Sequence, residues 1–156
     1  MPGRCAAQAA AEKGDLKIMI WLKENGCPWA QPSVCASAAR GGQLQMLMWA
    51  REQGCVWDKT TCVEAAHRGS FELLKWAREN GCLWNTDVFY YAAKLGDRKM
   101  LKWLRKQECP WNASTFEIAA IEGNLKVLKW LKKKGCPGNS RACYLTATKG
   151  HHEVLK

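Results

Sequence analysis

The chain has 156 residues, a formal net charge of +10 and nine cysteines, and this length suits a single ordinary core. No segment approaches the roughly 18 to 20 uninterrupted apolar residues of a membrane span, and the first residues lack the apolar segment of a secretory signal. An odd number of cysteines without such a signal favours a reducing compartment. Membrane and secreted classes are therefore excluded, and we expect a cytoplasmic protein.

A four-residue string recurs along the whole chain at nearly constant spacing. It reads Gly-Cys-x-Trp at residues 26–29, 54–57 and 81–84, and continues as Cys-Pro-Trp at 109–111 and Gly-Cys-Pro at 135–137. Successive cysteines are 28, 27, 27 and 27 residues apart. A fixed period of this length indicates equal repeats stacked into a solenoid, a class that binds through an extended surface. We divide the chain into one array of about five and a half repeats, at residues 5–29, 30–57, 58–84, 85–111, 112–138 and 139–156.

Each repeat predicts two helices separated by glycine, and the third repeat is the clearest. Thr60 is expected to cap a first helix that ends at Arg68, and Gly69 can take the left-handed conformation that closes it. Ser70 is expected to cap the second helix, which Gly81 ends. Small residues predict a tightly packed inner face on the first helices. In chain order these residues are Cys35, Ala38 and Ala39; Cys62, Ala65 and Ala66; Phe89, Ala92 and Ala93; Phe116, Ala119 and Ala120; Cys143, Thr146 and Ala147.

Tryptophan occupies one equivalent position in five second helices: Trp21, Trp49, Trp76, Trp103 and Trp130. The second helices are apolar over more than half of their circumference, which is typical of helices sandwiched between neighbours. We therefore expect these tryptophans to be buried and to hold the stack together, so that Trp76→Ala would cost about 3 to 5 kcal/mol.

The repeated cysteines predict neither disulfides nor a metal site. Equivalent positions in packed helices lie about 8 to 10 Å apart, whereas a disulfide needs Cα atoms within about 7 Å. The chain has no Cys-x-x-Cys, and its histidines are His67, His151 and His152, so zinc lacks its usual ligand spacing. We expect free thiols, no metal and no cofactor. His67 lies three repeats away from the other two histidines, and the pattern offers no set of converging catalytic groups, so we expect no enzyme.

The repeat resembles the ankyrin repeat. Thr60–Gly69 and Ser114–Gly123 fall into register with the family pattern Thr-Pro-Leu-His-x-Ala-Ala-x-x-Gly, and Gly81-Cys82 matches its closing Gly-Ala. Ankyrin repeats have about 33 residues, and the six that are missing here fall where the family places its β-hairpin tip. The resemblance therefore implies an all-α, ankyrin-like helix-turn-helix solenoid that lacks or nearly lacks β-hairpins. It also places the connector tryptophans Trp29, Trp57, Trp84 and Trp111 in the core.

Short arrays with Cys-Pro-Trp connectors resemble the ankyrin-like families of protists and giant DNA viruses, which would imply host cytoplasm if the source is viral. The last repeat stops inside its second helix, so we expect a fragment of a longer array. Such arrays can accompany an F-box or similar effector segment, but no such segment is encoded in these residues.

The resemblance implies a protein-binding scaffold. It also implies that the partner binds to the concave face of the first helices, at residues that vary between repeats. The predicted partner-binding residues are Arg40, His67, Arg68, Tyr90, Tyr91, Lys94, Leu95, Ile121 and Glu122. Exposed aromatic and aliphatic residues among them would anchor a protein partner. The alternative for Tyr90 and Ile118 is that they pack between neighbouring first helices. We expect a monomer with a protein partner.

A second interpretation is an anionic partner, either nucleic acid or a membrane surface. Residues 79–156 carry 14 basic and 7 acidic side chains, against 10 and 7 in residues 1–78. Stacking would align basic residues of the second helices into a stripe, formed by Lys102, Arg105, Lys106, Lys129, Lys132 and Lys133. The alternative is a solvated basic face that keeps the array soluble. The salt dependence of binding separates the two.

Overall fold

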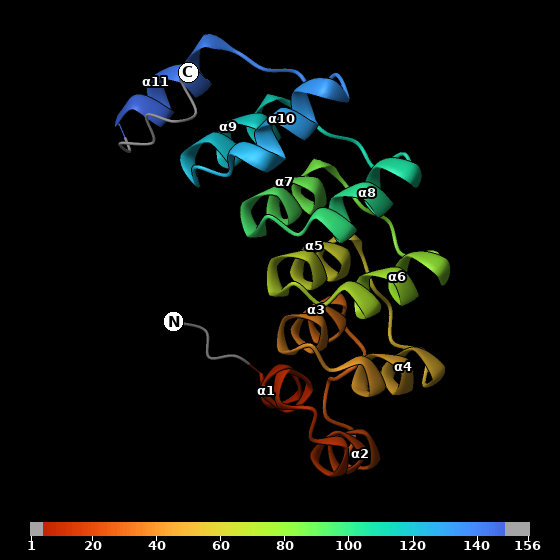
Figure 1. Ribbon diagram of the computed structural model, residues 1–156. Coiled ribbons are helices and arrows are strands. Elements are labelled where there is room, and N and C mark those ends of the chain that lie inside the picture. The colour runs from red at the N-terminus through yellow and green to blue at the C-terminus, as the bar shows by residue number, and fades with distance from the viewer. Residues whose placement is uncertain (1–4, 149–156) are drawn as a thin grey trace. The chain divides into compact units, whose positions relative to one another are not determined.

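The computed structural model describes residues 5–148, apart from the side chains of Cys143 and Thr146. The end of the sixth repeat, with His151 and His152, lies outside these described residues. The part described consists of eleven helices and no strands (Figure 1). The helices are α1 (Ala6–Lys13), α2 (Leu16–Glu24), α3 (Pro32–Gly41), α4 (Leu44–Glu52), α5 (Lys59–Arg68), α6 (Phe71–Glu79), α7 (Thr86–Leu95), α8 (Arg98–Lys106), α9 (Ala113–Ile121), α10 (Leu125–Lys133) and α11 (Ser140–Thr148).

The helices form two compact units, Met1–Trp84 and Asn85–Lys156. In the N-terminal unit the first helices α1, α3 and α5 pack in sequence, and each carries its own second helix, α2, α4 or α6. The C-terminal unit repeats this arrangement with α7, α9 and α11 as first helices, and α8 and α10 pack on α7 and α9. The fold is an all-α helical solenoid, as predicted.

The helix ends follow the glycine pattern but not the predicted capping residues. Gly69 closes α5 with φ 80°, and its N–H reaches the carbonyl oxygens of Ala65 and Ala66. The expected cap at Thr60 is wrong, because the helix begins one residue earlier and the Asp58 carboxylate accepts the Thr60 N–H at 2.8 Å. Ser70 stands directly before α6 but makes no side-chain capping bond. The residue that follows the connector tryptophan is thus the N-cap of these first helices. It is Asp58 for α5, Asn85 for α7 and Asn112 for α9.

The predicted alanine pairs form the inner face of the first helices. Ala38–Ala39, Ala65–Ala66, Ala92–Ala93 and Ala119–Ala120 are each at most 1% exposed. Such small side chains let neighbouring helix backbones approach closely. Phe116 is only half-buried and Ala147 is exposed, so the predicted inner face weakens in the last two repeats.

The prediction that tryptophans form the core is wrong. Trp21 is 57% exposed, and the other second-helix tryptophans are half-buried, as are all four connector tryptophans. The second helices instead bury leucine, methionine and valine side chains. These include Met19 and Leu22; Met46 and Leu47; Leu73 and Leu74; Met100, Leu101 and Leu104; and Val127, Leu128 and Leu131. These aliphatic side chains fill the space against the first helices, so the wider indole rings are left at its margin.

The indole rings instead pair with each other along the margin of each unit. Trp29 and Trp49 have ring centroids 5.5 Å apart, and Trp57 and Trp76 follow at 5.8 Å. In the C-terminal unit Trp111 and Trp130 form the equivalent pair at 6.4 Å. Each pair joins a connector to the second helix of the next repeat, so the aromatic contacts link consecutive repeats.

In four repeats the repeated cysteine contacts the residue that directly precedes the first helix of the same repeat. The Cys82 Sγ lies 3.3 Å from the carbonyl oxygen of Asp58, the residue that precedes α5. The same pairing, always across 24 residues, joins Cys55 to Gln31, Cys109 to Asn85 and Cys136 to Asn112 at 3.4 to 3.9 Å. A thiol is a weak hydrogen-bond donor, but the contact recurs in four repeats. We call it the cysteine clasp.

Candidate protein-interaction surfaces

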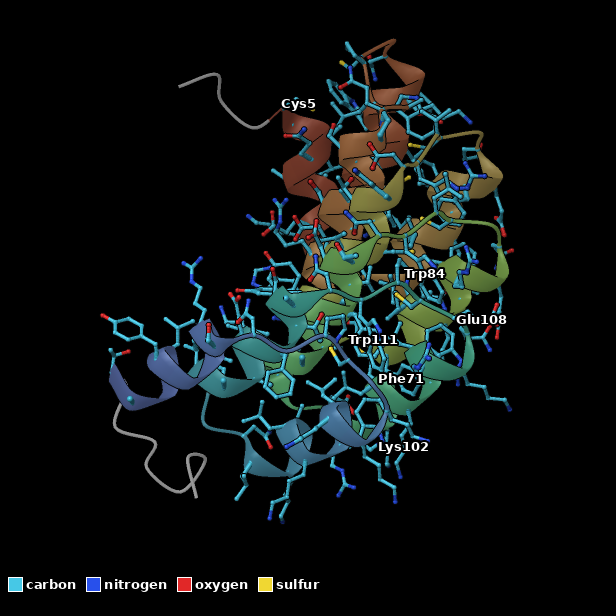
Figure 2. The ribbon with its side chains drawn as sticks, turned by 90° about the horizontal axis from the view of Figure 1, so that it is seen from above. Cys5, Phe71, Trp84, Lys102, Glu108 and Trp111 are labelled. Atoms are coloured by element: carbon cyan, nitrogen blue, oxygen red, sulfur yellow. The ribbon has the colours of Figure 1, made fainter. Side chains whose placement is uncertain are left out.

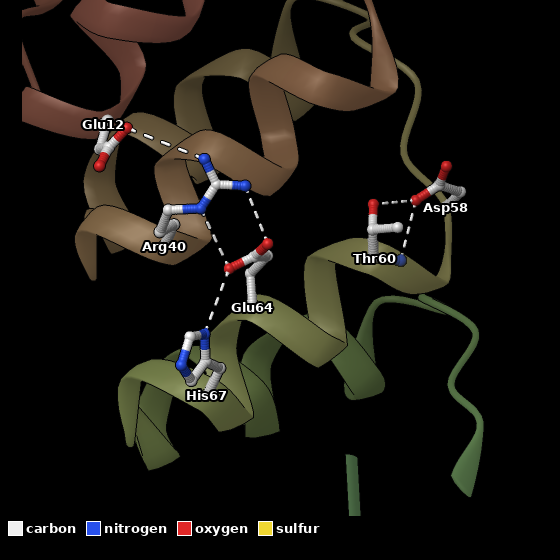
Figure 3. A network of polar contacts seen from close by, with 6 residues as sticks. All are labelled: Glu12, Arg40, Asp58, Thr60, Glu64 and His67. Atoms are coloured by element: carbon white, nitrogen blue, oxygen red, sulfur yellow. Dashed lines mark hydrogen bonds and ion pairs between the residues drawn. The ribbon is translucent and has the colours of Figure 1, made fainter. Parts of the chain in front are cut away.

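The N-terminal unit carries an ion-pair network on its first helices (Figure 3). The Arg40 guanidinium, at the end of α3, donates two hydrogen bonds to the Glu64 carboxylate of α5, at 2.8 and 3.1 Å. The Glu12 carboxylate of α1 lies 4.0 Å from the same guanidinium, and the His67 Nδ1 lies 3.8 Å from Glu64. The hydrogen bonds to Glu64 raise the pKa of Arg40. Three consecutive first helices are therefore joined through one arginine.

Two of the predicted partner-binding residues, Arg40 and His67, take part in this network within the unit. Arg40 is half-buried and bound on both sides, so its role within the unit is to join helices. His67 and Arg68 are exposed at the end of α5. Beside Arg40 and Glu64 lies an open cleft of about 380 Å³, whose other lining residues include Gln8, Ser33 and Thr60. This face of the N-terminal unit is thus polar and charged.

The C-terminal unit presents a more apolar first-helix face. Tyr90 and Tyr91 lie on α7, both half-buried, with ring centroids 5.3 Å apart and ring planes at 87°. One turn further on, Lys94 is exposed and Leu95 is 51% exposed. Edge-to-face ring contacts of this kind fix the orientation of both tyrosines.

The neighbouring helix α9 packs against α7 and continues this face. Ile121 at its end is half-buried, and Glu122 directly after it is exposed. Ile118 is only 5% exposed, which agrees with its alternative interpretation as a packing residue. We call Tyr90, Tyr91, Lys94, Leu95, Ile121 and Glu122 the tyrosine cluster.

The predicted basic stripe lies on the second helices of the same unit. Lys102, Arg105, Lys106, Lys129, Lys132 and Lys133 are all exposed, and Figure 2 marks Lys102. Arg105, however, lies 4.5 Å above the ring centroid of Trp111. Its guanidinium is engaged within the unit, and the lysines carry the charge that faces solvent.

Sequence reasoning missed the stacking of arginine on the connector tryptophans. Arg51 lies 4.2 Å from the Trp57 ring centroid, and Arg78 lies 4.3 Å from that of Trp84. The same arginines donate to the carbonyl oxygens of Cys55 and Cys82. The signal was available, because a basic residue precedes each connector tryptophan by six positions, beginning with Lys23 before Trp29.

Six of the described cysteines are buried, namely Cys35, Cys55, Cys62, Cys82, Cys109 and Cys136, whereas Cys27 is half-buried and Cys5 is exposed. Cys35 and Cys55 are fully buried, with their sulfur atoms 3.4 Å apart, and both are free thiols. The hydrogen bond to Cys55 and burial raise the pKa of Cys35. Burial also raises the pKa of Cys136 to about 11, although Arg105 opposes this shift. Within residues 5–148, no three His, Cys, Asp or Glu side chains come together in a way that could hold a metal ion. No described helix is long and apolar enough to cross a bilayer.

Comparison with known proteins identifies the fold. No family model and no curated protein matches the chain. Among solved structures, the ankyrin repeat domain of human ASB11 aligns with a TM-score of 0.66 at 18% identity, covering 86% of this chain and 71% of that one. A chain in the structure of the Bd0816 predatory endopeptidase from Bdellovibrio bacteriovorus in complex with immunity protein Bd3460 aligns with a TM-score of 0.68 at 17% identity, covering 98% and 97%. The repeat is therefore ankyrin-like in fold, as predicted.

Proposed function

We propose that this protein is a binding scaffold that recognises a protein partner through the first-helix face of its repeats, and that the tyrosine cluster is the main anchor. The observation that carries the proposal is the exposed Leu95 beside the paired rings of Tyr90 and Tyr91. Protein interfaces are enriched in aromatic residues that lose little conformational entropy on binding. The two rings already hold each other, which lowers that cost further.

Charge at the edge of the tyrosine cluster supports the same function. Lys94 and Glu122 are both exposed and border the apolar residues, an arrangement in which a polar rim surrounds an apolar centre. A solved ankyrin-like neighbour comes from a complex of an endopeptidase with an immunity protein, which is consistent with protein recognition by this fold. Arg68 and His67 form a separate polar patch on the N-terminal unit, for which we propose a secondary role in selecting the partner. We propose no catalytic role, and we propose that the chain acts as a monomer in the cytoplasm.

The test combines partner identification with a double variant, Lys94→Glu with Leu95→Ser. Both side chains are exposed, so the substitutions should leave the melting temperature unchanged. A photo-crosslinking residue placed at Leu95 should capture a protein from the source cell, which mass spectrometry identifies. Calorimetry with that purified protein should then show binding that is at least about 10-fold weaker for the double variant, equivalent to about 1.4 kcal/mol.

A matched control exists on α2, where Lys17 and Ile18 also form an adjacent exposed pair of a lysine and an aliphatic residue. The variant Lys17→Glu with Ile18→Ser should bind the partner as the unmodified protein does. Equal loss in both double variants, or loss in neither, would contradict an anchor at the tyrosine cluster.

A further inference from the structure

The second helices of the C-terminal unit are basic in a way that those of the N-terminal unit are not. Helix α8 carries Arg98, Lys99, Lys102, Arg105 and Lys106, and α10 carries Lys126, Lys129, Lys132 and Lys133. Neither helix contains an aspartate or a glutamate. By contrast, α2, α4 and α6 each end in a glutamate. Among the second helices, the excess of basic over acidic residues is thus largest in α8 and α10.

The repeat places these charges in register. The 27-residue period aligns Lys99 with Lys126, Lys102 with Lys129, and Lys106 with Lys133. All six are exposed, and we call them the lysine face. Within a helix, positions three or four apart lie about 5 to 6 Å from each other. The lysine face therefore presents cations at a spacing of several ångströms along each of the two helices.

Contacts around Trp111 hold the two helices of the lysine face close together. The Arg105 guanidinium of α8 lies 4.5 Å from the Trp111 ring centroid, and Trp130 of α10 lies 6.4 Å from it on ring centroids. Trp111 also meets Phe89 at 5.0 Å. The connector ring thus bridges α8 and α10.

The composition of the lysine face argues against two classes of anionic partner. A folded protein, or a membrane into which an amphipathic helix inserts, would contact exposed apolar residues. Among the described residues, the large exposed hydrophobic side chains all lie elsewhere: Ile18, Ile20, Trp21, Val56, Leu83, Leu95 and Tyr144. Lysine itself is depleted at the centre of protein interfaces. The lysine face offers charge without an apolar anchor.

The aromatic residues also argue against single-stranded nucleic acid. Single strands bind through exposed rings on which bases stack. Trp111 is covered by Arg105, and Trp103 and Trp130 are half-buried. What remains fits the regularly spaced phosphates of a duplex, which lysines contact without reading sequence.

We propose that the lysine face binds the phosphate backbone of duplex nucleic acid, independently of the base sequence. This site is separate from the tyrosine cluster and does not depend on it. About five phosphate contacts would give a slope near −4.5 for log affinity against log salt concentration.

Fluorescence anisotropy of a labelled DNA duplex, titrated with the full chain over a range of NaCl concentrations, tests the proposal. The triple variant Lys102→Gln, Lys106→Gln and Lys129→Gln should bind at least about 10-fold more weakly at low salt, and its slope should be shallower by about 2.7 because three phosphate contacts are lost. Two duplexes of unrelated sequence should bind equally.

A matched control removes the same charge from the N-terminal unit, where Lys13, Lys17 and Lys59 are exposed. The variant Lys13→Gln, Lys17→Gln and Lys59→Gln should keep the slope of the unmodified protein. Equal weakening by both triple variants would overturn the proposal, since net charge alone would then explain binding. So would absence of binding at low salt, which is expected of a merely solvated face, or tighter binding to phosphatidylserine vesicles, to polyglutamate or to single-stranded DNA than to the duplex.

Discussion

At the residue scale, one position departs from the backbone pattern of the repeats. Gly26, Gly54, Gly81 and Gly135 precede the repeated cysteines Cys27, Cys55, Cys82 and Cys136 with φ between 70° and 87°. The equivalent position before Cys109 is Glu108, with φ 56°. A residue with a Cβ atom pays about 1 to 2 kcal/mol in this left-handed region. The fourth repeat therefore stores backbone strain at its connector.

Glu108→Gly is expected to stabilise the protein by about 1 kcal/mol, because glycine adopts the same conformation without the steric cost. The denaturant midpoint should rise while the slope of the unfolding transition stays constant. The neighbouring Gln107 has φ −86°, so Gln107→Gly should give no gain. A lower midpoint for Glu108→Gly would show that the carboxylate makes a stabilising interaction that outweighs the strain.

At the element scale, the packing of the second helices depends on aliphatic side chains, with tryptophan at their margin. In α6, Leu74 is fully buried whereas Trp76 is half-buried against Trp57. A smaller fraction of the Trp76 side chain than of the Leu74 side chain is therefore removed from solvent, although the tryptophan is larger. This reverses the order of importance expected from the sequence.

Leu74→Ala is expected to cost about 3 kcal/mol in the free energy of unfolding, within the range for buried leucine. Trp76→Ala should cost less, about 1 to 2 kcal/mol, because water already reaches part of the ring and its main gain is one aromatic contact. Urea denaturation of the two variants compares them directly. A greater loss for Trp76→Ala would restore tryptophan as the main stacking residue.

At the scale of the whole molecule, buried thiols make stability dependent on alkaline pH. Cys136 has its pKa raised from an ordinary value of 9.0 to about 11 by burial. Because the folded state holds this proton more tightly, the stabilisation from Cys136 is complete below pH 9.0. It is lost as pH rises from there through the folded pKa.

Between pH 8 and pH 10.5, ionisation of Cys136 alone should lower the free energy of unfolding by about 2 kcal/mol. Cys136→Ala removes the ionisable group and should show a smaller decrease over the same interval, even if it is less stable at pH 8. Urea titrations at the two pH values measure both. A decrease of the same size in the variant would assign the pH effect to other groups.

Some features of the fold were readable from the sequence because they depend on local rules. The alanine pairs such as Ala65 and Ala66, and the closing Gly69, follow from helix period and backbone freedom, and both predictions are confirmed. The true cap Asp58 was also readable, since an aspartate or asparagine follows three connector tryptophans. Thr60 was a reasonable but wrong alternative two residues later.

Other features depend on how the repeats stack, which the period alone does not determine. The tryptophans occupy equivalent positions in the repeats, but equivalence does not determine how far a position is exposed to solvent. Their burial was therefore predicted wrongly. The bond between Arg40 and Glu64 joins neighbouring repeats across 24 residues, and nothing local marks either residue as its partner. The residues of the tyrosine cluster remain predictions as partner contacts. The repeat pattern constrains the residues that pack inside the array, whereas the exposed residues differ from one repeat to the next.

The cysteine clasp has a consequence for how such arrays can lengthen. Both of its atoms belong to one repeat, as with Cys82 and Asp58, so a duplicated block of 27 residues arrives with its own closure already encoded. Insertion or loss of a whole block leaves no clasp without its acceptor, whereas a break inside a block does. Gene duplication can therefore change the length of the array in whole repeats, and the exposed residues of each new copy can vary without loss of this contact.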